Sequence, residues 1–374
     1  MIINIASFGG RCHLLDTARE LERHGHTVRF YSYITNGRAA AFGLKKECNY
    51  SLLWFAWPYL IWMRLFGFGG WGTLLYQWLC DILLCYYMKP CDVFIGQSPM
   101  HYRSLKWAKH KWGATTILER GNSHVLEYIR NLSDTPEGQH FKSFAIKQDT
   151  KAYPIPDYIS VGAEHVKESF LTHGIDESRL FVNNYGFDSS QFKPSKLRGN
   201  YDIIMVGTWS LRKGCDRIVN ACKTKGYKCL HVGPVGDYPL PDDGSITSMG
   251  TVDQQELQRY YEQAKVFVLP SREEGLALVL MQAAACGLPI VCSRESGGSD
   301  LRQYAMQPEY IQELPDTDIP TLCYAIDRAL EYADAQTGVR NYMGAGLHSI
   351  SFEAYGNRYN DFLITVKGNK RQYL

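Results

Sequence analysis

Short apolar segments alternate with longer amphipathic ones along the whole chain, and this pattern occurs twice. In the first half, strands are predicted at residues 2–7, 27–33, 92–96, 115–119 and 158–161. Helices are predicted between them at residues 14–24, 102–111 and 163–173, the first and last of which stop at a glycine. The pattern restarts near Asp202. Such alternation is typical of parallel sheets covered by helices, so we predict an α/β fold with two Rossmann-like, doubly wound domains.

The boundary between the two domains is predicted at residues 188–200. This stretch is polar and contains Pro194 and Gly199, as expected of a linker. The 374 residues are enough for two domains that each close a core. We therefore expect an N-terminal domain over residues 1–188 and a C-terminal domain over residues 200–350, facing a central cleft. Ligands are expected there, at the carboxyl ends of the strands.

Charge and cysteine content exclude several classes of protein. The 40 Lys and Arg residues against 38 Asp and Glu residues argue against a polybasic nucleic-acid binder, and we expect no nucleic-acid partner. The eleven cysteines are scattered without a C-x-x-C pair, so we expect reduced, mostly buried thiols and no zinc ribbon. No secretory signal opens the chain, and a cytoplasmic location is expected.

Residues 52–88 are unusually aromatic and contain five of the eight tryptophans. Their longest apolar run, residues 52–63, has about 12 residues and includes Pro58, which is short of the ~20 needed to span a bilayer. Tryptophan and tyrosine settle at lipid headgroups, and basic side chains that could meet anionic lipid lie nearby. These are Arg64, Lys89, Arg103, Lys106, Lys109 and Lys111. We predict a peripheral, membrane-facing surface; the alternative is a pair of buried helices.

Two motif matches are discounted by their context. Gly67, Gly69 and Gly72 satisfy G-x-G-x-x-G, but an aromatic helical run precedes them and Asp92 starts the next strand instead of ending it. A dinucleotide site is therefore not expected. Asp316 and Asp318 match the D-x-D of metal-dependent sugar transferases, but they precede a helix and are better interpreted as its cap.

Candidate anion sites follow the first strand of each half. Gly9 and Gly10 lie between a strand and a helix, where an anion could approach bare backbone N–H groups. In the second half, Gly207 ends a strand, and Arg212 and Lys213 precede a helix, an arrangement that suits a diphosphate. The alternatives are an ordinary tight turn in the first case and a solvated charged turn in the second.

A carboxylate and an amide form the next candidate pair. Glu274 lies in the loop after the strand that ends at Pro270, and Gln282 lies about two turns inside the helix that follows. Both side chains could reach one ligand.

These segments resemble the retaining glycosyltransferases of family 4, which have the GT-B fold. The resemblance is strong from about Asp157 to Asp300, looser in the first domain and weak between Leu52 and Met88. It rests mainly on MVGTWSLRKGCDRIVNA and LPSREEGLALVLMQAAACGLPIVCSRESGG. It implies that the C-terminal domain holds a nucleotide-diphosphate sugar, that the N-terminal domain holds the acceptor, and that a helix over residues 351–374 crosses back to the first domain.

The resemblance also implies roles for individual residues. Lys213 would hold the donor diphosphate with Gly10, Glu274 would contact donor-sugar hydroxyls, and Gly207 and Arg212 would complete the donor site. The backbone of Leu276, Ala277 and Leu278 would meet the phosphates. No cofactor or metal is implied if these cations stabilise the leaving diphosphate.

Two positions depart from the family pattern. The glutamate that takes the ribose hydroxyls in relatives is Gln282 here, which loses a charge-assisted hydrogen bond. The usual arginine two residues after the Val-Gly pair is Trp209, and Arg212 is the candidate substitute. Weaker or altered donor binding is expected.

The acceptor side of the cleft is predicted from the segment after the strand at 115–119. Glu119, Arg120, Ser123 and His124 follow this strand, and Arg11 follows the first one. By resemblance, His124 would orient the acceptor or steady developing charge, and His124, Lys213 and Glu274 form the predicted catalytic set. The alternative is that Ser123 caps a helix and that the next residue, His124, is solvated.

The sequence therefore predicts a metal-independent, retaining hexosyltransferase that modifies a lipid-linked or glycan acceptor during surface polysaccharide synthesis, at the cytoplasmic face of a membrane. A non-catalytic relative that binds nucleotide sugar and an epimerase or phosphorylase of the GT-B type stay open as alternatives.

Overall fold

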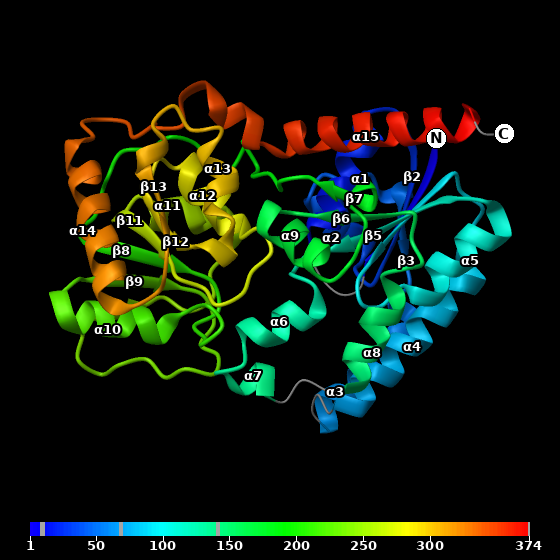
Figure 1. Ribbon diagram of the computed structural model, residues 1–374, viewed down its shortest axis with the longest axis horizontal. Coiled ribbons are helices and arrows are strands. Elements are labelled where there is room, and N and C mark those ends of the chain that lie inside the picture. The colour runs from blue at the N-terminus through cyan, green and yellow to red at the C-terminus, as the bar shows by residue number, and fades with distance from the viewer. Residues whose placement is uncertain (8–11, 67–69, 140–142, 373–374) are drawn as a thin grey trace.

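The computed structural model describes residues 1–7, 12–66, 70–139 and 143–372. They form two lobes, each built on one parallel sheet covered by helices (Figure 1). The first lobe lies on the right of Figure 1 and the second on the left, with the long helix α15 (Phe352–Gln372) running along the top toward the first lobe. The predicted α/β class with two doubly wound parallel sheets is confirmed.

The sheet of the first lobe has seven parallel strands. In spatial order they are β3 (Asn49–Ser51), β2 (Thr27–Ser32), β1 (Ile2–Ala6), β4 (Val93–Gln97), β5 (Thr115–Arg120), β6 (Tyr158–Val161) and β7 (Leu180–Val182). Ile3 is in register with Val28 on one side and Val93 on the other. The strand order reverses between β1 and β4, which places a ligand crevice at their carboxyl ends.

The second sheet has six parallel strands with the same kind of reversal. Their order is β10 (Ile246–Ser248), β9 (Cys229–Val232), β8 (Tyr201–Val206), β11 (Ala264–Leu269), β12 (Ile290–Ser293) and β13 (Ile311–Leu314). The central strands β8 and β11 are buried on both faces, which explains why they are continuous apolar runs and not alternating ones. The reversal between β8 and β11 places the loops that begin at Gly207 and Pro270 at the same crevice.

Helices cover both faces of each sheet. Those of the first lobe are α1 (His13–Arg23), α2 (Asn36–Ala41), α3 (Leu53–Phe66), α4 (Gly70–Tyr87), α5 (Tyr102–Trp112), α6 (Val125–Asn131), α7 (Pro136–Gln139), α8 (Ser143–Ala152) and α9 (Glu164–Thr172). Those of the second are α10 (Cys215–Lys225), α11 (Leu257–Tyr261), α12 (Leu278–Ala285), α13 (Gly298–Arg302) and α14 (Ile319–Ala335). Asp318 caps α14, its carboxylate accepting the Thr321 N–H at 2.7 Å, as predicted for the D-x-D match.

The helix α15 leaves the second lobe and packs along α1 of the first. The hydroxyls of Thr17 and Tyr355 lie 2.8 Å apart, and His26 meets Asn360 at 2.9 Å. Gly356 lies so close to Glu20 that a Cβ at this position would come within 2.4 Å of the Glu20 Cβ. The end of the chain therefore ties the two lobes together at the side opposite α6 and α7 (Figure 1).

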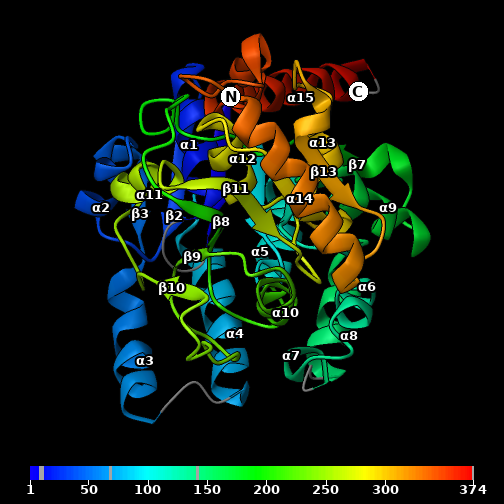
Figure 2. The ribbon, with the colours of Figure 1, turned by 90° about the vertical axis from the view of Figure 1, so that its left-hand side faces the viewer.

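The aromatic segment forms α3 and α4, which extend side by side from the first lobe (Figure 2). They are not the buried pair of the alternative interpretation, because Trp54 and Tyr86 are 80% exposed and Leu65 is 70% exposed. Gly72 lies within α4 and not in a strand-to-helix turn, in agreement with the rejection of the dinucleotide motif. Among the described residues, no helix combines the length and apolar character needed to cross a membrane.

Asp81 is a buried carboxylate in the middle of the apolar helix α4, and it caps the neighbouring helix α5. It accepts hydrogen bonds from the backbone N–H groups of Arg103 at 2.7 Å and Ser104 at 3.0 Å, and from the Ser104 hydroxyl at 2.6 Å. The charge also lies at the positive end of the α5 dipole. This one residue fixes α4 against α5.

We expect Asp81→Ala to lower the free energy of unfolding by about 1–3 kcal/mol, because it leaves buried donors without a partner. Asp81→Asn retains one acceptor oxygen and should lose less. Urea denaturation measures both values. Equal stability of wild type and Asp81→Ala would contradict the capping role.

Candidate active site

The turn after β8 brings two cations to the crevice of the second lobe. Gly207 has a φ of 135°, a conformation that favours glycine, and Lys213 lies over it, with Cε 3.6 Å from where a Gly207 Cβ would be. Gly214 also has a positive φ, and a Cβ there would lie 2.1 Å from the Pro270 carbonyl oxygen. The two glycines allow the turn to sit close against the loop after β11.

Glu274 is the meeting point of the two cations. Its Oε1 lies 2.5 Å from Lys213 Nζ and 2.9 Å from Arg212 Nη1. Arg212 also donates to the Glu273 carbonyl oxygen at 3.2 Å. The structure thus brings together the three polar side chains that the sequence placed on two different loops.

Charge controls the protonation state of Glu274. Burial alone would raise its pKa, but the positive charges of Lys213 and Arg212 and the hydrogen bond from Lys213 hold the pKa below its ordinary value. Glu274 is therefore a carboxylate at neutral pH, and it orients the two cations.

The adjacent residue, Glu273, binds the opposite lobe. It is fully buried, and its carboxylate accepts the Ser123 N–H at 3.0 Å and the Asn131 side-chain amide at 2.7 Å. Burial raises the pKa of Glu273 despite these hydrogen bonds. Sequence reasoning missed this residue because its only signal is its position beside Glu274, and its partners lie about 150 residues away in the chain.

Further contacts join the lobes around these glutamates. His165 Nε2 donates to the Glu274 carbonyl oxygen at 3.1 Å, and Asp300 accepts the Asn184 side-chain amide at 2.9 Å. At Gly275, a Cβ would lie 1.7 Å from the Gly121 carbonyl oxygen, so any larger residue would push the lobes apart. The loop after β11 therefore contacts the first lobe directly.

The remaining predicted donor residues lie around α12. Leu276 and Ala277 are buried, and the Ala277 N–H lies 3.4 Å from the Ser296 carbonyl oxygen. Leu278 begins α12, which has no side-chain cap and so presents the positive end of its dipole. Leu278 and Gln282 line a cavity of about 200 Å³ together with His13 of the first lobe. Gln282 also accepts a hydrogen bond from the Tyr261 hydroxyl at 3.1 Å.

Trp209 does not fill the role of the arginine that the family resemblance led us to expect at this position. It is fully buried, and its indole N–H donates to the Pro239 carbonyl oxygen at 3.3 Å. Arg212 is the cation that reaches Glu274 in its place. Two further predicted site residues, Gly10 and Arg11, lie outside the described residues.

Glu119 and Arg120 are buried and engaged with the protein itself. Glu119 lies 3.2 Å from His13 Nε2 and accepts from the Tyr359 hydroxyl at 3.3 Å. Arg120 pairs with Asp149 at 2.9 Å and donates to the Ser98 hydroxyl and the Ser123 carbonyl oxygen. These side chains hold the end of β5 in place. The sequence led us to expect that they face an acceptor.

His124 occupies a structural position and not the open wall of the cleft. It is the N-cap of α6, with Nδ1 accepting the Leu126 N–H at 3.4 Å, and its ring stacks on His173 at 4.1 Å between centroids. Ser123 is buried and is joined to Glu273 through its N–H. The expectation that Ser123 caps α6 beside a solvated His124 is therefore wrong, because the buried imidazole itself supplies the cap.

Comparison with known proteins supports this description of the fold. Residues 200–331 match the family model described as glycosyl transferases group 1. The amylovoran biosynthesis glycosyltransferase AmsK of Erwinia amylovora is 27% identical over 163 residues, which cover 37% of this chain and 39% of AmsK. The alignments with the first curated relatives span 37% to 52% of their own lengths.

Two solved structures match nearly the whole chain. Sucrose-phosphate synthase from Thermosynechococcus elongatus has a TM-score of 0.69 at 15% identity, covering 98% of this chain and 99% of that one. Anabaena HepE in complex with UDP and glucose has a TM-score of 0.65 at 12% identity, covering 98% and 100%. The chain therefore has the GT-B fold, and its residues 200–331 match the glycosyl transferases group 1 family model.

The buried cap predicts a pH-dependent stability. Burial, followed by the charges of His173 and Arg120, lowers the pKa of His124 from 6.5 to about 4. Because the pKa of His124 is lower in the folded state than in the unfolded state, the neutral ring favours folding at pH values above 6.5. This contribution to the free energy of unfolding is lost as the pH falls from 6.5 to about 4. Across this pH window we expect the free energy of unfolding of wild type to fall by up to about 3 kcal/mol relative to that of His124→Asn. Asparagine keeps a capping side chain but does not titrate. Urea denaturation between pH 7.5 and 4 measures the difference; a pH-independent difference would contradict it.

Proposed function

We propose that the protein is a retaining glycosyltransferase that moves a hexose-type sugar from a nucleotide-diphosphate sugar to a lipid-linked or glycan acceptor in cell-surface polysaccharide synthesis. One observation carries the proposal: Lys213 and Arg212 converge on Glu274 at the switch point of a glycosyl transferases group 1 domain. Two cations held together by one carboxylate form a site for a doubly charged group.

The donor would bind with its diphosphate on Lys213 and Arg212. The open N-terminus of α12 at Leu278 would add backbone N–H groups, and Gly207 would let the phosphates approach the turn. Glu274 would then exchange part of its contact with the cations for hydrogen bonds to sugar hydroxyls. Gln282, already within reach of Tyr261, would hold the ribose as a neutral amide.

The chemistry would depend on charge stabilisation. As the bond between sugar C1 and the phosphate oxygen breaks, negative charge grows on the diphosphate, where Lys213 and Arg212 lower its energy. An acceptor hydroxyl would form the new bond to C1 on the same face and pass its proton to the leaving phosphate oxygen. This route retains the anomeric configuration and uses no protein nucleophile. Because two side-chain cations supply the positive charge, we propose that no metal ion is required.

The membrane side of the proposal rests on α3 and α4. Trp54, Trp57 and Trp78 are 80%, 52% and 43% exposed on these helices, and Arg103, Lys106 and Lys111 lie on α5 beside α4. Exposed aromatic rings next to basic side chains suit the headgroup layer of an anionic leaflet. We propose that this surface rests on the cytoplasmic face of a membrane.

A second candidate is a nucleotide-sugar-binding protein without transferase activity. Gln282 favours it, since this amide stands where relatives carry a glutamate and already accepts a hydrogen bond from Tyr261. Such a protein would bind the donor and turn over none of it.

Donor turnover tests the site. We expect Lys213→Ala and Glu274→Ala to lower sugar transfer by about 100-fold or more, because each removes part of the charge array around the diphosphate. Donors would be screened by thermal shift, beginning with UDP-glucose, and transfer would be assayed with the best one. The exposed residues Lys223 and Glu309 supply the matched controls Lys223→Ala and Glu309→Ala. Unchanged transfer in the two site variants would overturn the assignment, and donor binding without transfer in wild type would favour the second candidate.

Flotation with liposomes tests the membrane surface. We expect wild type to float with vesicles that contain phosphatidylglycerol, and the double variant Trp54→Ala, Trp57→Ala to float several-fold less, because it loses interfacial rings. Tyr324→Ala, which removes a 68% exposed ring from α14 of the other lobe, is the control. Absence of wild-type binding, or equal binding by the double variant, would contradict the proposal.

A further inference from the structure

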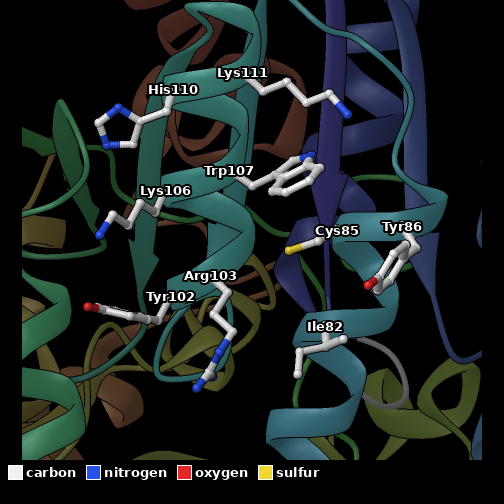
Figure 3. Close-up of a pocket in the computed structure, with 9 residues that line it drawn as sticks. All are labelled: Ile82, Cys85, Tyr86, Tyr102, Arg103, Lys106, Trp107, His110 and Lys111. Carbon is white, nitrogen blue, oxygen red and sulfur yellow. The ribbon is translucent and has the colours of Figure 1, made fainter.

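A groove separates α4 from α5 on the outer side of the first lobe (Figure 3). Its volume is about 690 Å³, within the range of about 300–1,000 Å³ that small-molecule sites occupy. Ile82, Cys85 and Tyr86 line it from α4, and Tyr102, Arg103 and Trp107 line it from α5. In Figure 3 the Trp107 ring points across the groove toward the α4 side chains.

A second cavity continues the first along α4. It has a volume of about 640 Å³ and is lined by Leu74, Leu75 and Trp78 of α4 and by Lys147 and Lys151 of α8. Tyr102 and Arg103 line both cavities. The two cavities therefore adjoin at these residues, and together we call them the α4–α5 groove.

The charge of the groove is one-sided. Its walls are mainly apolar, and the basic side chains along it are Arg103, Lys106 and Lys111 of α5 and Lys147 and Lys151 of α8. No carboxylate is among the described residues that line either cavity. Asp81 of α4 is buried under the start of α5, where it accepts hydrogen bonds from the backbone N–H groups of Arg103 and Ser104. It lies 4.0 Å from the Arg103 guanidinium. Arg103 itself is held over the Trp78 ring at 5.5 Å, so it stands at the junction of the two cavities.

The α8 end of the groove also adjoins the predicted acceptor side. Lys147 and Lys151 share α8 with Asp149, which pairs with Arg120 at the end of β5. Gln148, which also lines the second cavity, donates to the Pro99 carbonyl oxygen after β4. One helix therefore separates the cations of the groove from the loops that follow the strands of the first lobe.

We propose that the α4–α5 groove binds a single lipid that has a long hydrocarbon chain and a phosphate headgroup. The chain would lie between Ile82, Cys85 and Trp107, where apolar area is removed from water. The phosphate would be held by Arg103, Lys147 and Lys151, because charge-assisted bonds from these groups favour an anion over a neutral head. Resting on the proposed function, this lipid is the carrier of the acceptor sugar, drawn from the leaflet on which α3 and α4 lie.

Isothermal titration calorimetry with dodecyl phosphate, kept below its critical micelle concentration, tests the groove directly. We expect one dodecyl phosphate per protein, dodecanol binding at least tenfold more weakly, and no detectable binding of inorganic phosphate. Dodecanol bound as tightly as dodecyl phosphate would overturn the role of the cations. Inorganic phosphate bound as tightly as dodecyl phosphate would overturn the role of the chain.

Two substitutions separate the apolar and charged parts of the groove. Cys85→Trp fills the groove from α4 and should abolish binding of dodecyl phosphate; Ile82→Trp serves the same purpose should the first variant not fold. Arg103→Gln should weaken dodecyl phosphate binding about tenfold and leave dodecanol unchanged. Lys46→Gln, at an exposed position on the same lobe, is the control. Wild-type affinity in the groove-filling variant would overturn the proposal.

The outcomes also distinguish this inference from the proposed function. Lys213→Ala should abolish transfer and leave dodecyl phosphate binding unchanged, and the Trp54, Trp57 double variant should bind dodecyl phosphate like wild type. Binding of dodecyl phosphate without any sugar transfer would support the lipid-binding groove and contradict the proposed transferase activity. Sugar transfer to a water-soluble acceptor without binding of dodecyl phosphate would support the transferase activity and contradict the lipid-binding groove.

Discussion

The loop after β11 holds the molecule and its site together, because two adjacent glutamates in it serve different lobes. Glu274 gathers Lys213 and Arg212 of its own lobe, and Glu273 accepts hydrogen bonds from Ser123 and Asn131 of the other. A buried carboxylate is stable only when its oxygens are satisfied. A displacement of this loop would therefore disturb the cation pair and the interlobe contact together, which couples the geometry of the cation pair to the position of the first lobe.

The first lobe is attached at a second place by α15, whose Tyr355 and Tyr359 reach Thr17 and Glu119. The outer side of the first lobe, which carries α3, α4 and α5, is built differently from the cleft. There, Asp81 fixes α4 against α5 while the aromatic faces of α3 and α4 are left exposed. The outer side of the first lobe is therefore aromatic and exposed, whereas the cleft is lined by buried charged groups.

Sequence patterns predicted the central strands and the donor residues because both depend on local features. Apolar runs such as residues 203–206 mark strands buried on both faces, and a glycine-bounded turn with two cations marks an anion site. Edge strands such as β3, β7 and β10 were missed, since three residues carry too little pattern and depend on a neighbour for their hydrogen bonds. The stacking of His124 on His173 was not predicted, because a contact across 49 residues leaves no local signal.

By itself, the sequence determined two doubly wound lobes, the turn that carries Arg212 and Lys213, and the loop that carries Glu274, because backbone periodicity and glycine conformations are local properties. Only the tertiary structure decided which side chains face a ligand and which are held inside the protein. Arg120 and His124 are buried by partners from other helices, and Glu273 is assigned to the opposite lobe. Hydrogen bonds and ring contacts between distant segments set these positions, and such pairings exist only once the lobes have packed.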